Sequence, residues 1–185
     1  MTIILIIVGI VVLLVLWFIA IANKLAKKKM KAEQAFADVD VYLTQRYDLI
    51  PNLVSTVKGY SKHEKETFEA VVKARNAAVN AGNMNEKIDA DNVVTEAIGK
   101  LFALAEAYPE LKANENFVKL QDSLESVEKD LVGARRYFNA AAQEYNFATK
   151  VIPDTIVAGI LGYKPISMFT ASEEQRKNVK VDFEN

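Results

Sequence analysis

The side chains that could do chemistry are few, and they do not combine into a catalytic set. The chain has one histidine, His63, and no cysteine, which excludes histidine-pair zinc sites, thiolate metal sites and disulfides. His63-Glu64 begins like a zinc-protease helix motif, but Thr67 stands where the second histidine must follow. We therefore assign no catalytic, metal-binding or cofactor-binding residue and expect a protein that is not an enzyme.

The strongest candidates for a binding site are four arginines, two on predicted inner helix faces (Arg46 and Arg75) and two beside the seam of a predicted long helix (Arg135 and Arg136). Their candidate partners are Asp40, Asp48 and Glu144. A buried arginine needs a partner, because an unpaired one costs several kcal/mol. We favour the interpretation that these pairs fix the register of the helices. The alternative is a pocket for an anionic ligand or for an acidic side chain of another protein.

An apolar run near the amino terminus must position the rest of the chain. Residues 3–22 carry no charged side chain, and about 20 such residues are enough for a helix to cross a bilayer. Residues representative of the span are Ile3, Ile7, Val11, Leu14, Trp17 and Ile21. A cleaved signal peptide is the alternative, but it needs a basic start, a shorter apolar core and a small-residue cleavage site. We therefore predict a transmembrane anchor over residues 1–23.

Lysines follow the apolar run directly. They are Lys24, Lys27, Lys28, Lys29 and Lys31. No lysine or arginine precedes the run, so the positive-inside bias places the downstream chain in the cytoplasm and the amino terminus outside. We expect these lysines to contact the anionic headgroups of the bilayer. With a net charge of −1, the chain offers no surface for nucleic acid.

Helical periodicity fills the chain after the anchor. One apolar stripe consists of Phe36, Val39, Leu43, Ile50, Leu53, Val57 and Tyr60. Pro51 lies within this stripe, and an interior proline costs a helix about 3 kcal/mol or more because it removes a hydrogen bond. Since the stripe keeps its phase across Pro51, we predict a kinked helix. A helix that ends at Ile50 is the alternative.

Further helices follow from capping signals and spacing. Ser61-Lys62-His63-Glu64 has the capping-box pattern and predicts a helix that starts near residue 62. Another helix is predicted over residues 86–108, and a long one over residues 117–152, whose seam alternates steps of three and four. The seam consists of Phe117, Leu120, Leu124, Val127, Leu131, Ala134, Phe138, Ala141, Tyr145, Ala148 and Ile152. A short helix capped by Asp154 and closed by Gly162 completes the set.

We predict an all-α fold, an N-terminal transmembrane helix followed by an antiparallel four-helix bundle with two long and two short helices. Its parts are the anchor, a cytoplasmic bundle over residues 24–169 and a polar tail over residues 170–185. Long helices of about 37 residues reach about 55 Å, whereas the short ones reach about 30–35 Å. The short pair can therefore cover only the half of the long pair that lies away from the membrane.

The remaining half of the long pair, which we call the stalk, comprises residues 24–47 and 134–150. Two helices alone bury too little apolar surface to be comfortably stable. We therefore expect the stalk to form a homo-oligomer by packing against copies of itself. The small side chains that would permit close approach are Ala140, Ala141, Ala142 and Ala148.

An apolar segment near the carboxyl end returns to the membrane surface in this geometry. It contains Ile156, Val157, Ile160, Leu161, Met168 and Phe169. It could lie among the lipid headgroups, or it could plug the open end of the bundle. We favour the plug because the segment carries a single lysine and no basic face.

Long stretches of the chain match a known pattern. They are TQRYDLIPNLVSTVKGYSKHEKETFEAVVKARN, LFALAEAYPELKANENFVKLQDSLESVEKDLVGARRYFNAAAQEYN, GYKPISMF and VKVDF. In these stretches the chain resembles the LemA family of bacterial membrane proteins, over nearly its whole length after the anchor. The resemblance implies one N-terminal membrane helix and a cytoplasmic helical bundle in the bacterial cell membrane. The family is related to MamQ, which is implicated in building magnetosome membranes, and this relation implies membrane organisation.

These observations together lead to two functional hypotheses. The first is a non-enzymatic, single-pass membrane protein that self-associates as a scaffold or organiser at the inner face of the membrane. The second is a membrane-anchored adaptor that binds a cytosolic protein in a helix groove.

Overall fold

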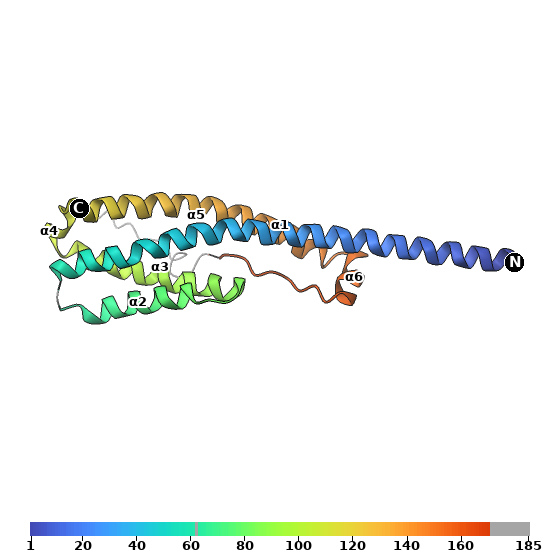
Figure 1. Cartoon of the computed structure of the whole chain (residues 1–185), viewed down its shortest axis with the longest axis horizontal. Coiled ribbons are helices and arrows are strands. Elements are labelled where there is room, and N and C mark those ends of the chain that lie inside the picture. The colour runs from blue at the N-terminus through green and yellow to red at the C-terminus, as the bar shows by residue number, and fades with distance from the viewer. Residues whose placement is uncertain (62, 171–185) are drawn as a thin grey trace, which may run out of the picture. The chain divides into compact units, whose positions relative to one another are not determined.

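The computed structural model describes residues 1–61 and 63–170, and each regular element in these ranges is a helix (Figure 1). The helices are α1 (Thr2–Tyr60), α2 (Lys65–Val79), α3 (Met84–Glu106), α4 (Pro109–Lys112), α5 (Glu115–Ala148) and α6 (Asp154–Ile160). The all-α class and the N-terminal apolar helix are confirmed. The predicted polar tail, apart from Thr170, lies outside the described residues.

Contacts divide the chain into two compact units, and two of the three boundaries fall inside helices, one in α1 and one in α5. Unit 1 comprises Met1–Asp48 and Gln121–Met168. Unit 2 comprises Leu49–Leu120 with Phe169 and the residue that follows it. The arrangement of the whole domain as a four-helix bundle stays a prediction. So does the division at residue 23, which falls inside α1.

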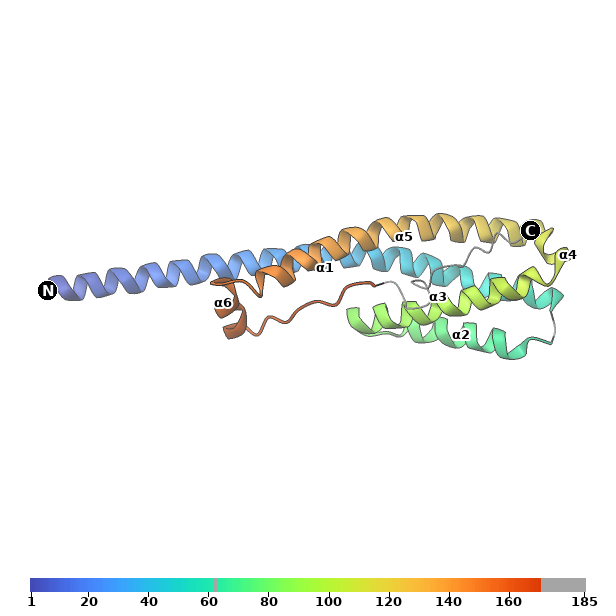
Figure 2. The ribbon, with the colours of Figure 1, turned by 180° about the vertical axis from the view of Figure 1, so that it is seen from behind.

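Unit 1 is built from the first part of α1, most of α5 and α6. In Figures 1 and 2, α5 and α6 lie alongside α1, and the blue N-terminal part of α1 extends beyond both. Val39 and Leu43 of α1 are buried, as are Leu131 and Phe138 of α5. The ring of Phe138 meets Phe36 edge to face, with 5.3 Å between centroids. Burying each such side chain stabilises the fold by about 1.5–3 kcal/mol.

The predicted seam of α5 is confirmed at its buried positions as far as Ala148, where the helix ends. The extension to Ile152 is wrong, because the chain turns away after Ala148 and leaves Ile152 82% exposed. A seam pattern cannot distinguish the last helical turn from a loop residue that happens to be apolar.

Along most of its length, the apolar run at the start of α1 is not covered by any part of the chain that the structure describes. By length and composition α1 can cross a membrane, and none of its most apolar 18-residue window is buried. Ile3, Ile7, Val11 and Leu14 are all exposed, and so is Trp17. Ile21 differs, because it is buried in a cluster described below. An exposed apolar surface of this kind is what a lipid-facing helix requires.

Helix α1 continues through Pro51 to Tyr60, so the alternative in which the helix ends at Ile50 is wrong. Ile50 and Leu53 are buried on the two sides of the proline, whereas Pro51 itself is exposed. Burial of the stripe on both sides offsets the lost hydrogen bond, and the ring points away from the core. The kink at Pro51 stays a prediction.

In unit 2, the capping box predicted at the start of α2 does not form. Helix α2 begins at Lys65, and Glu64 at its N-cap makes no side-chain capping bond. The amide of Ser61 instead donates to the Val57 carbonyl, which continues the last turn of α1. The buried Ser61 hydroxyl donates to the Tyr108 hydroxyl at 3.1 Å. Ser61 thus extends the last turn of α1, although the local sequence pattern assigned it to the start of α2.

The cap that does form lies at the start of α3. The amide of Glu86 donates to Oδ1 of Asn83 at 3.0 Å, and Glu86 Oε2 accepts from the Gly82 amide at 2.8 Å. The Asn83 bond satisfies an amide that the helix start leaves open, and the Glu86 bond holds the preceding residue, so α3 begins at Met84, earlier than predicted. Pro109 follows the end of α3 and occupies the first turn of the short helix α4. We did not predict α4.

Candidate functional site

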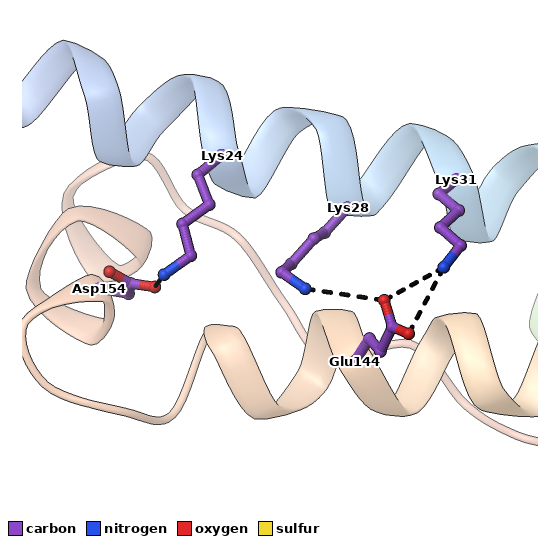
Figure 3. A network of polar contacts seen from close by, with 5 residues as sticks. All are labelled: Lys24, Lys28, Lys31, Glu144 and Asp154. Carbon is purple, nitrogen blue, oxygen red and sulfur yellow. Dashed lines mark hydrogen bonds and ion pairs between the residues drawn. The ribbon is translucent and has the colours of Figure 1, made fainter.

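Carboxylates of α5 and α6 face the lysines that follow the apolar run (Figure 3). Lys24 Nζ lies 2.5 Å from Asp154 Oδ2. Glu144 Oε2 lies 3.2 Å from Lys31 Nζ and 3.7 Å from Lys28 Nζ. These pairs join α1 to α5 and α6 at the point where the apolar run gives way to charge.

The two acidic residues in this cluster have different surroundings. Lys31, by its hydrogen bond and then by its charge, lowers the pKa of Glu144, and the charge of Lys28 adds to the effect. Since Glu144 is exposed, its pairs stabilise the fold only weakly. The Asp154 side chain is only 4% exposed. A buried carboxylate is costly without a counter-charge, which Lys24 supplies.

Ion pairs within unit 1 reduce the positive charge that the lysine run could present to a membrane surface. Lys29 lies 3.5 Å from Glu33 and 5.9 Å from the centre of the Tyr163 ring. Lys27 forms no ion pair with any described residue. Most of the predicted lipid-facing charge is thus neutralised within unit 1, and headgroup contact by these lysines stays a prediction.

The inner face of α6 packs against the end of the apolar run. Its buried residues, Val157 and Ala158, form a cluster with Ile21 and Leu25 of α1 and Ala148 of α5. The partly buried side chains packed on this cluster are Phe18, Ala22 and Tyr163. Helix α6, part of the apolar segment that we expected to return to the membrane end of the long helices, thus packs beside the stalk. Its role as a plug of the whole bundle stays a prediction.

Two side chains of α5 fix the segment that follows α6. Asn146 pairs with Ile166 through a donated and an accepted bond, both 2.8 Å. The Tyr145 hydroxyl donates to the Lys164 carbonyl at 3.0 Å. Burial, followed by nearby Tyr163 and Glu33, raises the pKa of Tyr145. The phenol thus stays a neutral donor.

The ends of α6 confirm one prediction and contradict another. Gly162 has φ +69° and closes the helix, with the Tyr163 amide donating to the Ala158 carbonyl at 2.9 Å. Asp154 does not cap the helix, because the N-cap residue is Pro153 and no side-chain capping bond forms there. The carboxylate binds Lys24 instead.

Arg46 is the predicted arginine that the structure places most clearly. It is 2% exposed on the buried stripe, and its Nε lies 2.5 Å from Glu128 Oε1. Glu128 was not among the predicted partners, and Glu144 pairs with lysines instead. The position of Glu128 next to the seam residue Val127 was the only sequence signal for it.

The other candidates are spread over both units. Arg135 is half-buried, whereas Asp48 and Arg136 are exposed, and all three belong to unit 1. Arg75 belongs to unit 2, where its Nη1 donates to Asn76 Oδ1 at 3.4 Å. Residues 1–61 and 63–170 contain no group of three or more side chains placed to hold a metal ion.

Each unit carries a surface groove. In unit 1 a groove of about 450 Å³ is lined by Asp38, Val41, Tyr42, Asp130, Gly133, Ala134 and Tyr137. In unit 2 a groove of about 620 Å³ is lined by Val54, Lys58, Phe68, Glu69, Val72, Lys73, Asn76, Ala77 and Asn80. Of the four stalk alanines expected to permit close approach of another copy, Ala141, Ala142 and Ala148 are buried within unit 1, and Ala140 is exposed.

Comparison with known proteins finds one matching family and several relatives. A family model described as "LemA family" matches residues 35–183. "Magnetosome protein MamQ" of Magnetospirillum gryphiswaldense is 24% identical, over 75% of this chain and 60% of that protein. "Protein LemA" of Metamycoplasma hominis is 21% identical, over 85% of this chain and 72% of that protein. "Magnetosome protein MamQ 2" of Paramagnetospirillum magneticum is 30% identical over 44% of this chain and 30% of that protein.

Proposed function

The chain belongs to the LemA family, and on this premise we propose that it is a self-associating, non-enzymatic scaffold or organiser at the inner face of a bacterial membrane. The observation that carries the proposal is α1, which joins an exposed apolar run to the packed stripe of unit 1 without a break. Lysines only after the run support an outside amino terminus and a cytoplasmic domain. Similarity to proteins named for the magnetosome supports membrane organisation.

The groove of unit 1 supports self-association through the stalk. Val41 and Tyr137, which line it, are 55% and 54% exposed. The small residues Gly133 and Ala134 between them let another helix approach closely. Apolar surface rimmed by polar groups is typical of interaction sites. We therefore assign the homo-oligomer contact to this groove and not to the stalk alanines.

The test uses the full-length chain in lipid nanodiscs with two matched substitutions. Val41→Asp places a charge in the groove of unit 1, and Val72→Asp does the same in the groove of unit 2. Mass photometry should show oligomers for the unchanged chain and for Val72→Asp, and monomers for Val41→Asp. An unchanged chain that stays monomeric at micromolar concentration contradicts self-association.

Since the chain has no cysteine, a single Tyr137→Cys substitution gives a second readout in cells. Oxidation should yield a disulfide-linked dimer if two copies meet at this groove. A Val118→Cys chain, with a similarly exposed apolar side chain in unit 2, is the control.

The second candidate function is a membrane-anchored adaptor, and the groove of unit 2 favours it. Val54, Phe68 and Val72 form its apolar floor, while Lys58 and Glu69 offer charges of both signs at its edge. This combination suits the apolar face of an amphipathic helix from a cytosolic protein. The same pair of variants separates the candidates: an adaptor loses its partner in Val72→Asp and keeps it in Val41→Asp.

A further inference from the structure

We propose that α6 makes a second membrane contact, with its outer face seated in the headgroup zone of the leaflet where α1 leaves the bilayer. We use 'outer face of α6' for the exposed Ile156 and Ile160 of the helix together with the exposed residues that flank it, Ile152 and Leu161. This inference deepens the proposed function, because it rests on α1 being a membrane anchor.

The depth of α6 follows from what its inner face touches. Val157 and Ala158 pack with Ile21 and Leu25, and Phe18 covers the same cluster. If the apolar run, residues 3–22, fills the hydrocarbon core, the turns from Phe18 to Leu25 cross its inner edge, where the core meets the headgroups. An element packed on those turns lies at that depth too.

The outer face has the composition of an interfacial surface. Its four side chains are 82%, 55%, 68% and 44% exposed in the order given above. The one carboxylate between residues 149 and 170, Asp154, is buried against Lys24. The exposed charges that flank the face, Lys150 and Lys164, are both basic. Exposed aliphatic side chains beside basic ones favour an anionic lipid surface.

The outer face of α6 is continuous with the exposed surface of the predicted anchor. This continuity favours a lipid bilayer over another protein as the partner of that face. Trp17 and Ile19, one turn before the cluster, are exposed on the apolar run that must itself face lipid. The outer face of α6 thus adjoins a surface already committed to lipid. The plug and the interfacial segment, which we treated as alternatives, become the two faces of one helix.

The experiment measures the depth of single labels on the full-length chain in vesicles of phosphatidylcholine and phosphatidylglycerol. Because the chain has no cysteine, Ile156→Cys and Ile160→Cys can each carry one environment-sensitive fluorophore. Val11→Cys serves as a control within the predicted span. Val72→Cys is the control in unit 2, with an exposed apolar side chain. All four positions are exposed, so the labels disturb no packing.

We expect the Ile156 and Ile160 labels to emit at shorter wavelength than the Val72 label. Lipids with a nitroxide near the headgroup should quench them, and aqueous iodide should not. If iodide quenches them as it does the Val72 label while Val11 reports lipid, this inference is overturned and the anchor stands. Shielding from both quenchers means that protein covers the face, which also overturns it. A Val11 label in water refutes the anchor and the inference together.

Discussion

Units 1 and 2 are each stabilised internally by polar contacts, and these contacts differ in sequence separation. In unit 1 the pair Lys24 and Asp154 links residues 130 apart in sequence, and Lys31 meets Glu144 across 113. In unit 2 the cap at Glu86 is local, and the bond from Ser61 to Tyr108 spans 47 positions.

This difference distinguishes contacts that form within a short stretch of sequence from contacts that require distant segments to meet. The α2–α3 hairpin has a short connection and a local cap, so the loop closed on forming it is short. Unit 1 brings together residues 1–48 and 121–168, so its polar contacts between these segments form only after a long loop has closed. The following predictions test whether the two units behave as separately as their contacts suggest.

The largest effects should come from deleting core volume in one unit at a time. Leu131 in unit 1 and Leu101 in unit 2 are both fully buried. Replacing either with alanine should destabilise its own unit by about 3 kcal/mol. Hydrogen exchange followed by mass spectrometry should show faster exchange mainly in the altered unit. Equal acceleration in both units for either variant would mean a single cooperative block, and the comparison would break.

Glu128→Gln tests the buried ion pair of unit 1. Arg46 would stay charged and buried without its carboxylate, which should cost about 2–3 kcal/mol. Arg46→Met should cost less than about 1 kcal/mol, because Glu128, whose side chain is 34% exposed, can be hydrated. Chemical denaturation of both variants measures the difference.

The Arg46→Met variant also separates the two interpretations of the arginines. A chain that keeps its stability but loses its cellular phenotype points to a ligand or partner. Loss of a unique fold points to helix register.

The cap of α3 provides a smaller effect in unit 2. Asn83→Ala should cost about 1 kcal/mol, because a capping side chain is lost. Glu64→Ala, at the start of α2, should change stability by less than about 0.5 kcal/mol, because Glu64 makes no side-chain capping bond there. Thermal melts of the two variants under one condition give the ranking, and a larger loss for Glu64→Ala would contradict the structure.

The smallest effect should be the pH dependence that Glu144 gives to unit 1. Its pKa is lowered from 4.5 in the folded chain, so its contribution is complete above pH 4.5 and is lost as the pH falls through the lowered value. In low salt, Glu144→Gln should therefore exchange faster than the unchanged chain near neutral pH, and the two should converge in strong acid. A difference that persists in strong acid would assign the effect to packing.

Periodicity predicted which faces are buried. Arg46 lies on the stripe where the spacing placed it, and Leu131 and Phe138 lie on the seam. Gly162 adopts the positive φ that its place after a short apolar helix predicted. Such signals are read within one element, where the helical repeat relates position to face.

Pairing between elements could not be predicted in the same way. A stripe and a seam state which sides meet, but not how far one helix slides along the other. For that reason Glu144 was placed among the arginines and Glu128 was overlooked. Ser61 shows a second limit. The Ser-x-x-Glu pattern is present, but the Ser61 amide donates to the Val57 carbonyl, so the serine belongs to the last turn of α1. Helix α6 is too short for its spacing to reveal what it packs on.

The bond between Lys24 and Asp154 sets an order of events during synthesis. The ribosome must add 130 residues after Lys24 before Asp154 exists, which takes roughly 6–26 s at about 5–20 residues per second. If α1 is a membrane anchor, it is made long before the carboxylate that pairs with Lys24. A truncated nascent chain that lacks α6 should then still insert, because the contacts of α6 with α1 can form only afterwards.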